Sequence, residues 1–159
     1  MSSPRLRRRT PEPAEHRESL AAALDEVAAE SFFACVESPG EDASGDAGAW
    51  LCVDVGFGGA FGGELRVVLP EPLARDLYCA FLGCEPDAVP LERELFDLVG
   101  EFGNMVCGRW LTRTCGRRQF QLRAPAVRRD GSPAVDADAL CVAINGQPAW
   151  LRLRFEDDA

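Results

Sequence analysis

The sequence predicts an α+β domain in which a largely antiparallel sheet packs against two or three helices. Stretches with helical spacing and stretches with alternating apolar residues follow one another in the order α-β-β-α-α-β-β-β. Two pairs of predicted strands are joined by short connections rich in glycine, which is typical of hairpins and therefore of antiparallel pairing. The 159 residues suit one domain that can bury a core without disulfides.

The chain begins with a basic segment, residues 1–14, that holds an arginine cluster and almost no large apolar side chain. This composition is typical of a disordered tail, so we expect the single folded domain to span residues 15–159. A helical pattern follows over 15–37 and ends before the Pro39-Gly40 pair. An acidic, glycine-containing loop then leads to the first predicted strand.

Two strands are predicted over 50–55 and 63–69, where apolar residues alternate with polar ones. The connection between them reads GFGGAFGG. A glycine-rich nucleotide loop would open a helix that binds phosphate at its N-terminus, but here a second strand follows. The sequence therefore favours a hairpin or a bulged connection.

Two helices are predicted after this hairpin. The first spans 72–82, because Pro72 suits a first helical turn and Gly83 suits a helix end. The second spans 91–114, ends at Gly116, and contains the unbroken stretch ELFDLVGEFGNMVCG. The apolar residues of that stretch form one stripe at helical spacing, which predicts that the stripe packs on the core.

The C-terminal part of the chain is predicted to form three strands, over 120–127, 139–144 and 150–155. Pro125 lacks a backbone N–H, so it indicates a sheet edge, a strand end or a bulge. The connection over 145–148 begins with Asn-Gly, which is a strong hairpin signal between apolar runs.

The composition argues against several classes of site and partner. The net charge of −9 disfavours nonspecific binding of nucleic acid. Every basic residue is arginine, which excludes lysine nucleophiles, lysine general bases and P-loop lysines. His16 is the only histidine, so Ser-His-Asp catalysis, Cys-His catalysis and polyhistidine metal sites are excluded as well.

The seven cysteines include no C-x-x-C pair, and their number is odd. We therefore expect most of them to be free thiols that behave as small buried hydrophobes, and we expect no metal site. No apolar run is long enough to span a bilayer, and the basic N-terminus lacks a following apolar region. These features predict a soluble cytoplasmic protein in a reducing compartment, without a membrane partner.

A polar stripe runs along the second long helix. Asp97, Glu101 and Asn104 lie at i, i+4 and i+7, and Gly108 follows one turn later on nearly the same line. A solvated face more often mixes lysine, arginine and glutamate, whereas this one leaves room for an approaching partner. Asparagine is a poor residue within a helix, and Gly103 beside it weakens the helix further. Two unfavourable residues in one turn indicate a functional constraint.

The pattern Asp-x-x-x-Glu-x-x-Asn-Met that begins at Asp97, with Gly108 in the next turn and Pro125 in the next strand, resembles the signature of the CheC/CheX/FliY chemotaxis phosphatases. The similarity extends to the opening helix SLAAALDEVAAESF, the strand pair WLCVDVGFGGAFGGELRVVLP and the short helix ARDLYCAFLG. CheC-like members carry the motif twice. Asn145 is the only other asparagine and lies in a predicted turn, so the chain resembles a single-motif, CheX-like member.

The resemblance implies that the protein dephosphorylates a CheY-like response regulator and acts as a homodimer. It implies that Asn104 orients the attacking water and that Glu101 pairs with the lysine of the receiver active site. Asp97 and Gly108 are expected to contact the partner. The resemblance implies no cofactor of the protein's own, because Mg²⁺ is expected on the receiver. The gap from Asn104 to Pro125 is slightly shorter than in the family, so the loop between helix and strand is shorter by a residue or two.

The chemistry gives these residue types a reason. An aspartyl phosphate is an activated acyl phosphate, and the receiver already supplies a metal ion and a lysine, so a phosphatase mainly has to hold a water in line with the phosphorus. The carbonyl oxygen of a carboxamide can accept a hydrogen bond from that water, and its amide can donate nearby.

Two alternatives to the phosphatase remain open at the level of sequence. The domain could bind a receiver or a signalling assembly without hydrolysing anything, or it could be a small-molecule-binding α+β domain. Taken singly, Glu101 could be a solvated helix carboxylate, and Gly108 could mark close packing of the helix on the sheet. For the dimer, we expect contact through an exposed edge in the C-terminal hairpin.

Overall fold

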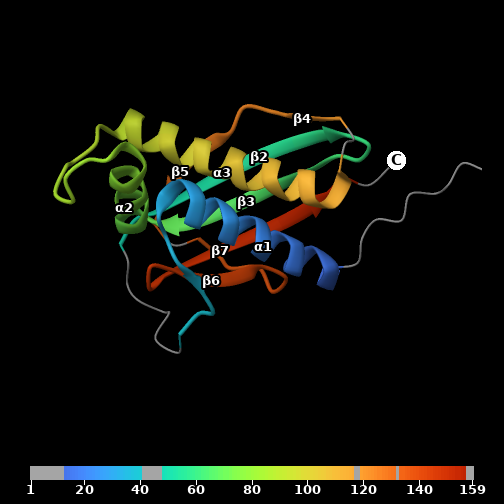
Figure 1. The fold of residues 1–159 in the computed structure, drawn as a ribbon, viewed down its shortest axis with the longest axis horizontal. Coiled ribbons are helices and arrows are strands. Elements are labelled where there is room, and N and C mark those ends of the chain that lie inside the picture. Colours follow the sequence, from blue (N-terminus) through green and yellow to red (C-terminus); the bar gives the residue numbers. More distant parts are fainter. Residues whose placement is uncertain (1–12, 41–47, 117–118, 132, 157–159) are drawn as a thin grey trace, which may run out of the picture.

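The structure is a computed structural model that describes residues 13–40, 48–116, 119–131 and 133–156. Three helices lie on one face of a seven-stranded antiparallel sheet (Figure 1), which confirms the predicted fold class. The strand order is β1-β6-β7-β3-β2-β4, and β5 also pairs with β2. The helices are α1 (Pro13–Phe32), α2 (Glu71–Leu82) and α3 (Glu92–Cys115). The strands are β1 (Val36–Glu37), β2 (Trp50–Gly59), β3 (Gly63–Pro70), β4 (Phe120–Leu122), β5 (Ala126–Asp130), β6 (Leu140–Ile144) and β7 (Gln147–Phe155).

The first helix differs from its prediction at both ends. It already begins at Pro13, which suits a first turn because proline lacks the N–H that would be unpaired there. Residues 1–12 of the predicted tail lie outside the described residues. The helix ends at Phe32 rather than near residue 37, since Phe33 takes a left-handed backbone conformation with φ of 52°. The next residues form the short strand β1, which the sequence analysis missed.

The predicted hairpin of β2 and β3 is confirmed, with a register that runs from Trp50 opposite Pro70 to Phe57 opposite Gly63. The glycine-rich connection is largely strand, because β2 continues to Gly59. Gly63 is required by packing, since a Cβ there would lie 2.4 Å from the carbonyl oxygen of Arg154. Close approach between strands, and not phosphate binding, accounts for this glycine.

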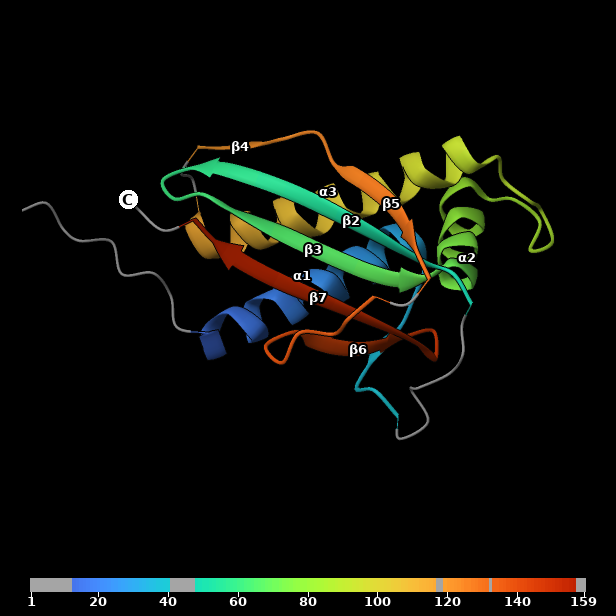
Figure 2. The same cartoon turned by 180° about the vertical axis from the view of Figure 1, so that it is seen from behind.

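The strand predicted over 120–127 is interrupted. Both β4 and β5 pair with β2, but Pro125 falls between them and has no N–H to donate to the sheet. Arg123 restores one contact within the interruption, where its backbone N–H donates to the carbonyl oxygen of Gly56 at 2.8 Å. The segment lies at the sheet edge (Figure 2), as the proline predicted.

The C-terminal hairpin has a two-residue turn. Asn145 and Gly146 have φ of 50° and 79°, the two positive values that a type I′ turn needs. Because β7 begins at Gln147, the connection is shorter than predicted. The side-chain oxygen of Asn145 accepts a hydrogen bond from the N–H of Cys35 at 2.9 Å, which ties this turn to the segment after α1.

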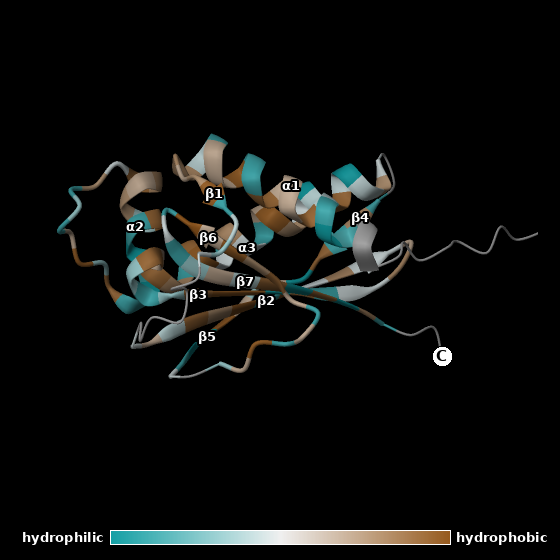
Figure 3. Cartoon of the chain, turned by 90° about the horizontal axis from the view of Figure 1, so that it is seen from below, coloured by the Kyte–Doolittle hydropathy of each residue, from teal (hydrophilic) through white to brown (hydrophobic). Residues whose placement is uncertain are grey.

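Seen along the sheet, the helices form one layer and the strands a second, with apolar residues facing each other between them (Figure 3). The seven cysteines all lie in the described residues and form no disulfide bond. Cys52, Cys79 and Cys107 are buried as expected, whereas Cys35 and Cys141 are exposed. Burial raises the pKa of the Cys107 thiol to about 12, so this thiol stays neutral and packs as an apolar group.

Candidate functional site

Helix α3 presents the polar stripe because its opposite face is fixed to the core. Its buried residues include Leu95, Leu98, Val99, Phe102 and Val106, which confirms the predicted apolar stripe. The first turn is held by Glu94, whose carboxylate accepts hydrogen bonds from the N–H of Leu91 at 3.3 Å and the hydroxyl of Tyr78 at 3.2 Å.

Two glycines let α3 approach the sheet closely. A Cβ at Gly103 would lie 3.0 Å from Val53 and 3.1 Å from Val55, and a Cβ at Gly100 would lie 3.0 Å from Cγ of Pro125. Packing therefore gives Gly103 a structural reason of its own.

Gly108 differs from these two glycines. A Cβ at this position would lie 3.9 Å from Cδ1 of Leu122, which is an ordinary van der Waals distance. Close packing of the helix on the sheet therefore does not account for Gly108.

These distances predict opposite effects of substitution within one helix. Replacement of Gly103 by valine is expected to destabilise the fold by about 1–3 kcal/mol, because added methyl groups overpack the contact with β2. Replacement of Gly108 by alanine is expected to stabilise it by up to ~1 kcal/mol through helix propensity. Chemical denaturation of both variants measures the difference, and equal effects would contradict the packing account.

The predicted site residues lie together on the outer face of α3. Asp97 and Glu101 are exposed, and Asn104 and Gly108 are partly exposed. At the helical rise of 1.5 Å per residue, the stripe from Asp97 to Gly108 extends about 16 Å along the helix. It is long enough to meet a partner surface over three turns.

Nearby acidic groups are neutralised, but those of the stripe are not. Arg109 of α3 binds Glu26 of α1 at 2.8 Å and Glu30 at 2.9 Å. Asp97 and Glu101, in contrast, form no hydrogen bond or ion pair with any residue that the structure describes. The stripe therefore presents two uncompensated negative charges, which favours a cationic group on a partner.

Asp54, on the helix-free face of the sheet, is another acidic residue whose charge is neutralised within the chain. Burial alone would raise the pKa of Asp54, but hydrogen bonds and charges of Arg66 and Arg128 hold it below its usual value. Asp54 lies 2.7 Å from Arg66 and 3.1 Å from Arg128. The carboxylate of Asp54 is thus already paired within the chain, whereas that of Glu101 is not paired with any described residue.

Asn104 is the most unusual residue of the stripe. Its side-chain oxygen is buried and accepts no hydrogen bond from the described residues. A buried polar atom without a partner costs about 1–3 kcal/mol, so the fold gains nothing from this carboxamide. Asn145, by comparison, uses its side-chain oxygen to bind Cys35. Of the two asparagines, Asn145 has a structural role and Asn104 has none that the fold shows.

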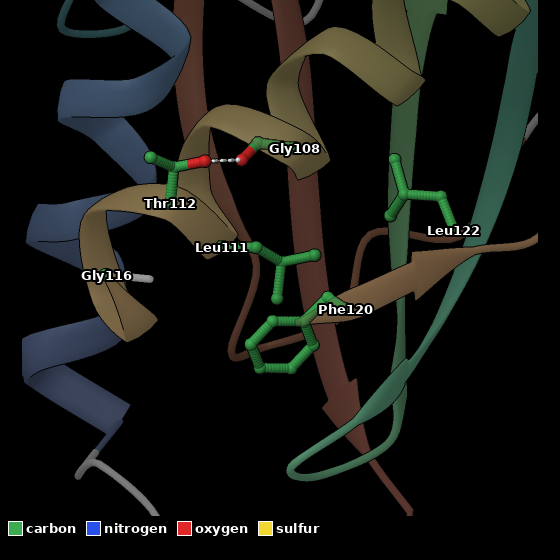
Figure 4. A pocket seen from close by; sticks show the side chains of 6 residues that line it. All are labelled: Gly108, Leu111, Thr112, Gly116, Phe120 and Leu122. Carbon is green, nitrogen blue, oxygen red and sulfur yellow. Dashed lines mark hydrogen bonds between the residues drawn. The ribbon is translucent and has the colours of Figure 1, made fainter. Parts of the chain in front are cut away.

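Of two neighbours of the stripe, Pro125 belongs to the pattern described in the sequence, whereas Leu122 does not. Pro125 lies against Gly100, and Leu122 lies beside Gly108 (Figure 4), so the β4–β5 edge flanks the outer face of α3. The alternation of Phe120 and Leu122 around a glutamine is the signal that one face of β4 is apolar. Its proximity to α3 depends on how β4 pairs with β2, which no local pattern reveals.

The described residues contain no group of three or more histidine, cysteine or acidic side chains that could hold a metal ion. Within the same ranges, no helix is long and apolar enough to cross a membrane.

Comparison with known proteins gives one family and a set of solved structures. The family model of the chemotaxis phosphatase CheX matches residues 51–145. The chemotaxis protein CheX from Vibrio vulnificus is 22% identical with a TM-score of 0.68, and the match covers 92% of this chain and all of that one. CheX from Desulfovibrio desulfuricans is 20% identical with a TM-score of 0.66, covering 89% and 99% of the two chains.

A third similar structure is the CheX–CheY–BeF3–Mg²⁺ complex from Borrelia burgdorferi. The match is 18% identical with a TM-score of 0.61, and it covers 89% of this chain and 98% of that one. A comparison with curated protein sequences finds no match. At these identities the structures establish the fold alone.

Proposed function

Because the chain belongs to the CheX family of chemotaxis phosphatases, we propose that it hydrolyses the aspartyl phosphate of a CheY-like receiver domain. The observation that carries the proposal is the carboxamide of Asn104, whose oxygen has no hydrogen-bond partner among the described residues. It lies one turn from Glu101, which is likewise unpaired within the described ranges. The Borrelia burgdorferi relative, whose structure contains CheY, supports a receiver as the partner.

In this proposal Asn104 positions the nucleophile. Its side-chain oxygen turns outward and accepts a hydrogen bond from a water that lies in line with the phosphorus. The water oxygen forms the new bond to phosphorus while the bond to the aspartyl oxygen breaks, which releases inorganic phosphate and a free carboxylate. The proton of the water leaves to solvent or phosphate, so Asn104 changes neither its charge nor its bonds.

Glu101 would fix the docked receiver. Its uncompensated carboxylate would pair with the receiver's active-site lysine, and the pair would strengthen as the surfaces exclude water. Asp97 and Gly108 would make further contacts at the two ends of the stripe. The protein would supply no cofactor of its own; Mg²⁺ held by the receiver would neutralise charge on the phosphoryl oxygens.

A non-catalytic receiver-binding or scaffold module is the second candidate, and the burial of the Asn104 oxygen favours it. In that case the stripe would need only Glu101 to hold a receiver. Binding to a BeF3-activated receiver and the lifetime of phosphate on the same receiver separate the two. The enzyme shortens the phosphate lifetime, whereas a scaffold binds the activated receiver and leaves that lifetime unchanged.

We also propose that the protein is a cytoplasmic homodimer in contact through the C-terminal hairpin. Within the described residues, β1 covers only Ala143 and Ile144 of β6, so the backbone over 140–142 is open to pairing. Light scattering at micromolar concentration should give twice the chain mass of 17.3 kDa. A mass of one chain would contradict the dimer.

A further inference from the structure

Two cysteines are brought together where helix α2 ends. Cys79 lies in the last turn of α2, and Cys84 follows Gly83, which ends the helix. Gly83 takes a left-handed conformation with φ of 68° and ψ of 28°, so the chain turns back on the helix. The backbone N–H of Cys84 then donates to the carbonyl oxygen of Cys79 at 3.0 Å. A Schellman cap joins these two positions in this way, and the side chains that they carry commonly touch.

The cap places both cysteines within reach of a disulfide bond. Hydrogen-bonded pairs in antiparallel strands have Cα atoms about 5.5 Å apart, and disulfides span Cα separations of roughly 4.4–6.8 Å. The thiol of Cys79 donates to the carbonyl oxygen of Glu85 at 3.4 Å, so it points toward the segment that carries Cys84. In a continuing helix, a residue five positions on would lie about 140° away around the axis. The turn at Gly83, and not the spacing alone, therefore pairs the two cysteines.

The two thiols differ in their access to solvent. Cys79 is 8% exposed, whereas Cys84 is partly exposed. Burial raises the pKa of the Cys79 thiol, and the charge of Cys84 raises it further because the two groups lie near each other. Cys84 is thus the cysteine that an oxidant in solution can reach, and Cys79 is the neighbour that can close a disulfide. Redox-sensitive cysteines commonly occur in such pairs.

We propose that Cys79 and Cys84 form a redox-sensitive pair that hydrogen peroxide converts into an intramolecular disulfide. The sulfur of Cys84 attacks one peroxide oxygen and the O–O bond breaks, which leaves a sulfenic acid on Cys84 and releases water. The sulfur of Cys79 then bonds to that of Cys84 while the S–O bond breaks, and the Cys79 proton leaves with the hydroxide as a second water. Two thiols and one peroxide thus give one disulfide and two waters, and the peroxide takes up the two electrons that the thiols lose.

The disulfide would tie the end of α2 to the segment that leads into α3. Within the described residues, these two helices are also joined by the hydroxyl of Tyr78, which donates to the carboxylate of Glu94 at 3.2 Å. A covalent bond beside this contact restricts the unfolded chain, so the oxidised protein should melt at a higher temperature than the reduced protein. The cysteine pair and the polar stripe lie on different helices, so the oxidation can be tested whether or not the protein acts on a receiver.

Peptide mapping can follow the pair directly. Trypsin cleaves after arginine and releases peptide 76–93, whose only cysteines are Cys79 and Cys84. Peptide 130–152 contains only Cys141, an exposed cysteine that serves as the matched control for simple accessibility. The folded protein is treated with hydrogen peroxide, remaining thiols are blocked with N-ethylmaleimide, and both peptides are analysed by mass spectrometry. We expect peptide 76–93 to lose two hydrogen atoms and take up no label, and to take up two labels after reduction with dithiothreitol.

Single variants test the order of the two steps. In Cys79→Ser, the accessible Cys84 should stop at the sulfenic acid, which dimedone traps. In Cys84→Ser, the buried Cys79 should keep its thiol and take up the label once the protein is unfolded. Thermal melting of both reduced variants shows that they are folded, and the wild-type peptide map does not depend on them.

Three outcomes would overturn the proposal. In the first, peptide 76–93 keeps both thiols at a peroxide dose that has already oxidised Cys141. In the second, the peptide gains only oxygen atoms, or Cys84 links two chains and not Cys79 of its own chain. In the third, the disulfide forms but the melting temperature does not rise, so the bond does not restrain the end of α2.

Discussion

Replacement of Asn104 by alanine is expected to slow aspartyl-phosphate hydrolysis by about 10²–10³-fold, the effect of removing one well-placed hydrogen-bonding group from an active site. The stability of the fold should not decrease. The side-chain oxygen accepts no hydrogen bond from the described residues, and alanine is a better helix former than asparagine. The melting temperature of the variant should therefore equal or exceed that of the wild type, as circular dichroism can measure.

Asn145→Ala is the matched control. This variant loses the hydrogen bond to Cys35 and places alanine at φ of 50°, so it should unfold at lower temperature. Its rate per folded molecule should be unchanged. We therefore expect the Asn104 variant to lose hydrolysis rate but not stability, and the Asn145 variant to lose stability but not rate. An Asn104→Ala protein that hydrolyses at the wild-type rate would contradict the assigned role.

Replacement of Glu101 by alanine is expected to weaken receiver docking by about 2–5 kcal/mol, if its carboxylate pairs with a lysine in a surface that excludes water. The fold should be unaffected, because Glu101 has no partner among the residues that the structure describes. Titration of a BeF3-activated receiver measures the loss of affinity. Glu101→Gln keeps the shape of the side chain without its charge and should lose nearly as much.

Asp97→Ala provides the control for this prediction. Asp97 is an acid on the same face, one turn earlier, and is equally without a partner in the described part of the chain. At the end of the stripe it should act mainly through long-range charge, with an effect below ~1 kcal/mol that falls as salt is added. Equal losses of receiver affinity for Asp97→Ala and Glu101→Ala would indicate that the stripe attracts the receiver by its general negative charge and not through a specific ion pair of Glu101.

Most elements of the fold could be predicted from local sequence patterns. The long helix, the β2–β3 hairpin and the Asn145-Gly146 turn were predictable, because helical spacing, strand alternation and turn residues are properties of neighbouring positions. The two-residue strand β1 was missed because it is too short to show a period. Its partner β6 lies more than a hundred residues away, so only the folded chain reveals the pairing.

The site was partly predictable for the same reason. Helical spacing was enough to place Asp97, Glu101, Asn104 and Gly108 on one face. Whether each side chain has a partner depends on distant segments, as for Arg109, which is held by α1. The packing reason for Gly103 could not be predicted, because its neighbours Val53 and Val55 come from another element.

We propose that this protein accelerates the loss of phosphate from a receiver domain and that Asn104 is the residue responsible. The most direct measurement is the decay of radiolabelled phosphate on a CheY-like receiver, alone, with the wild-type protein, and with Asn104→Ala. We expect rapid decay with the wild type and decay near the receiver's own rate with the variant. Equal decay with both proteins, or no acceleration by the wild type across several receivers, would contradict it.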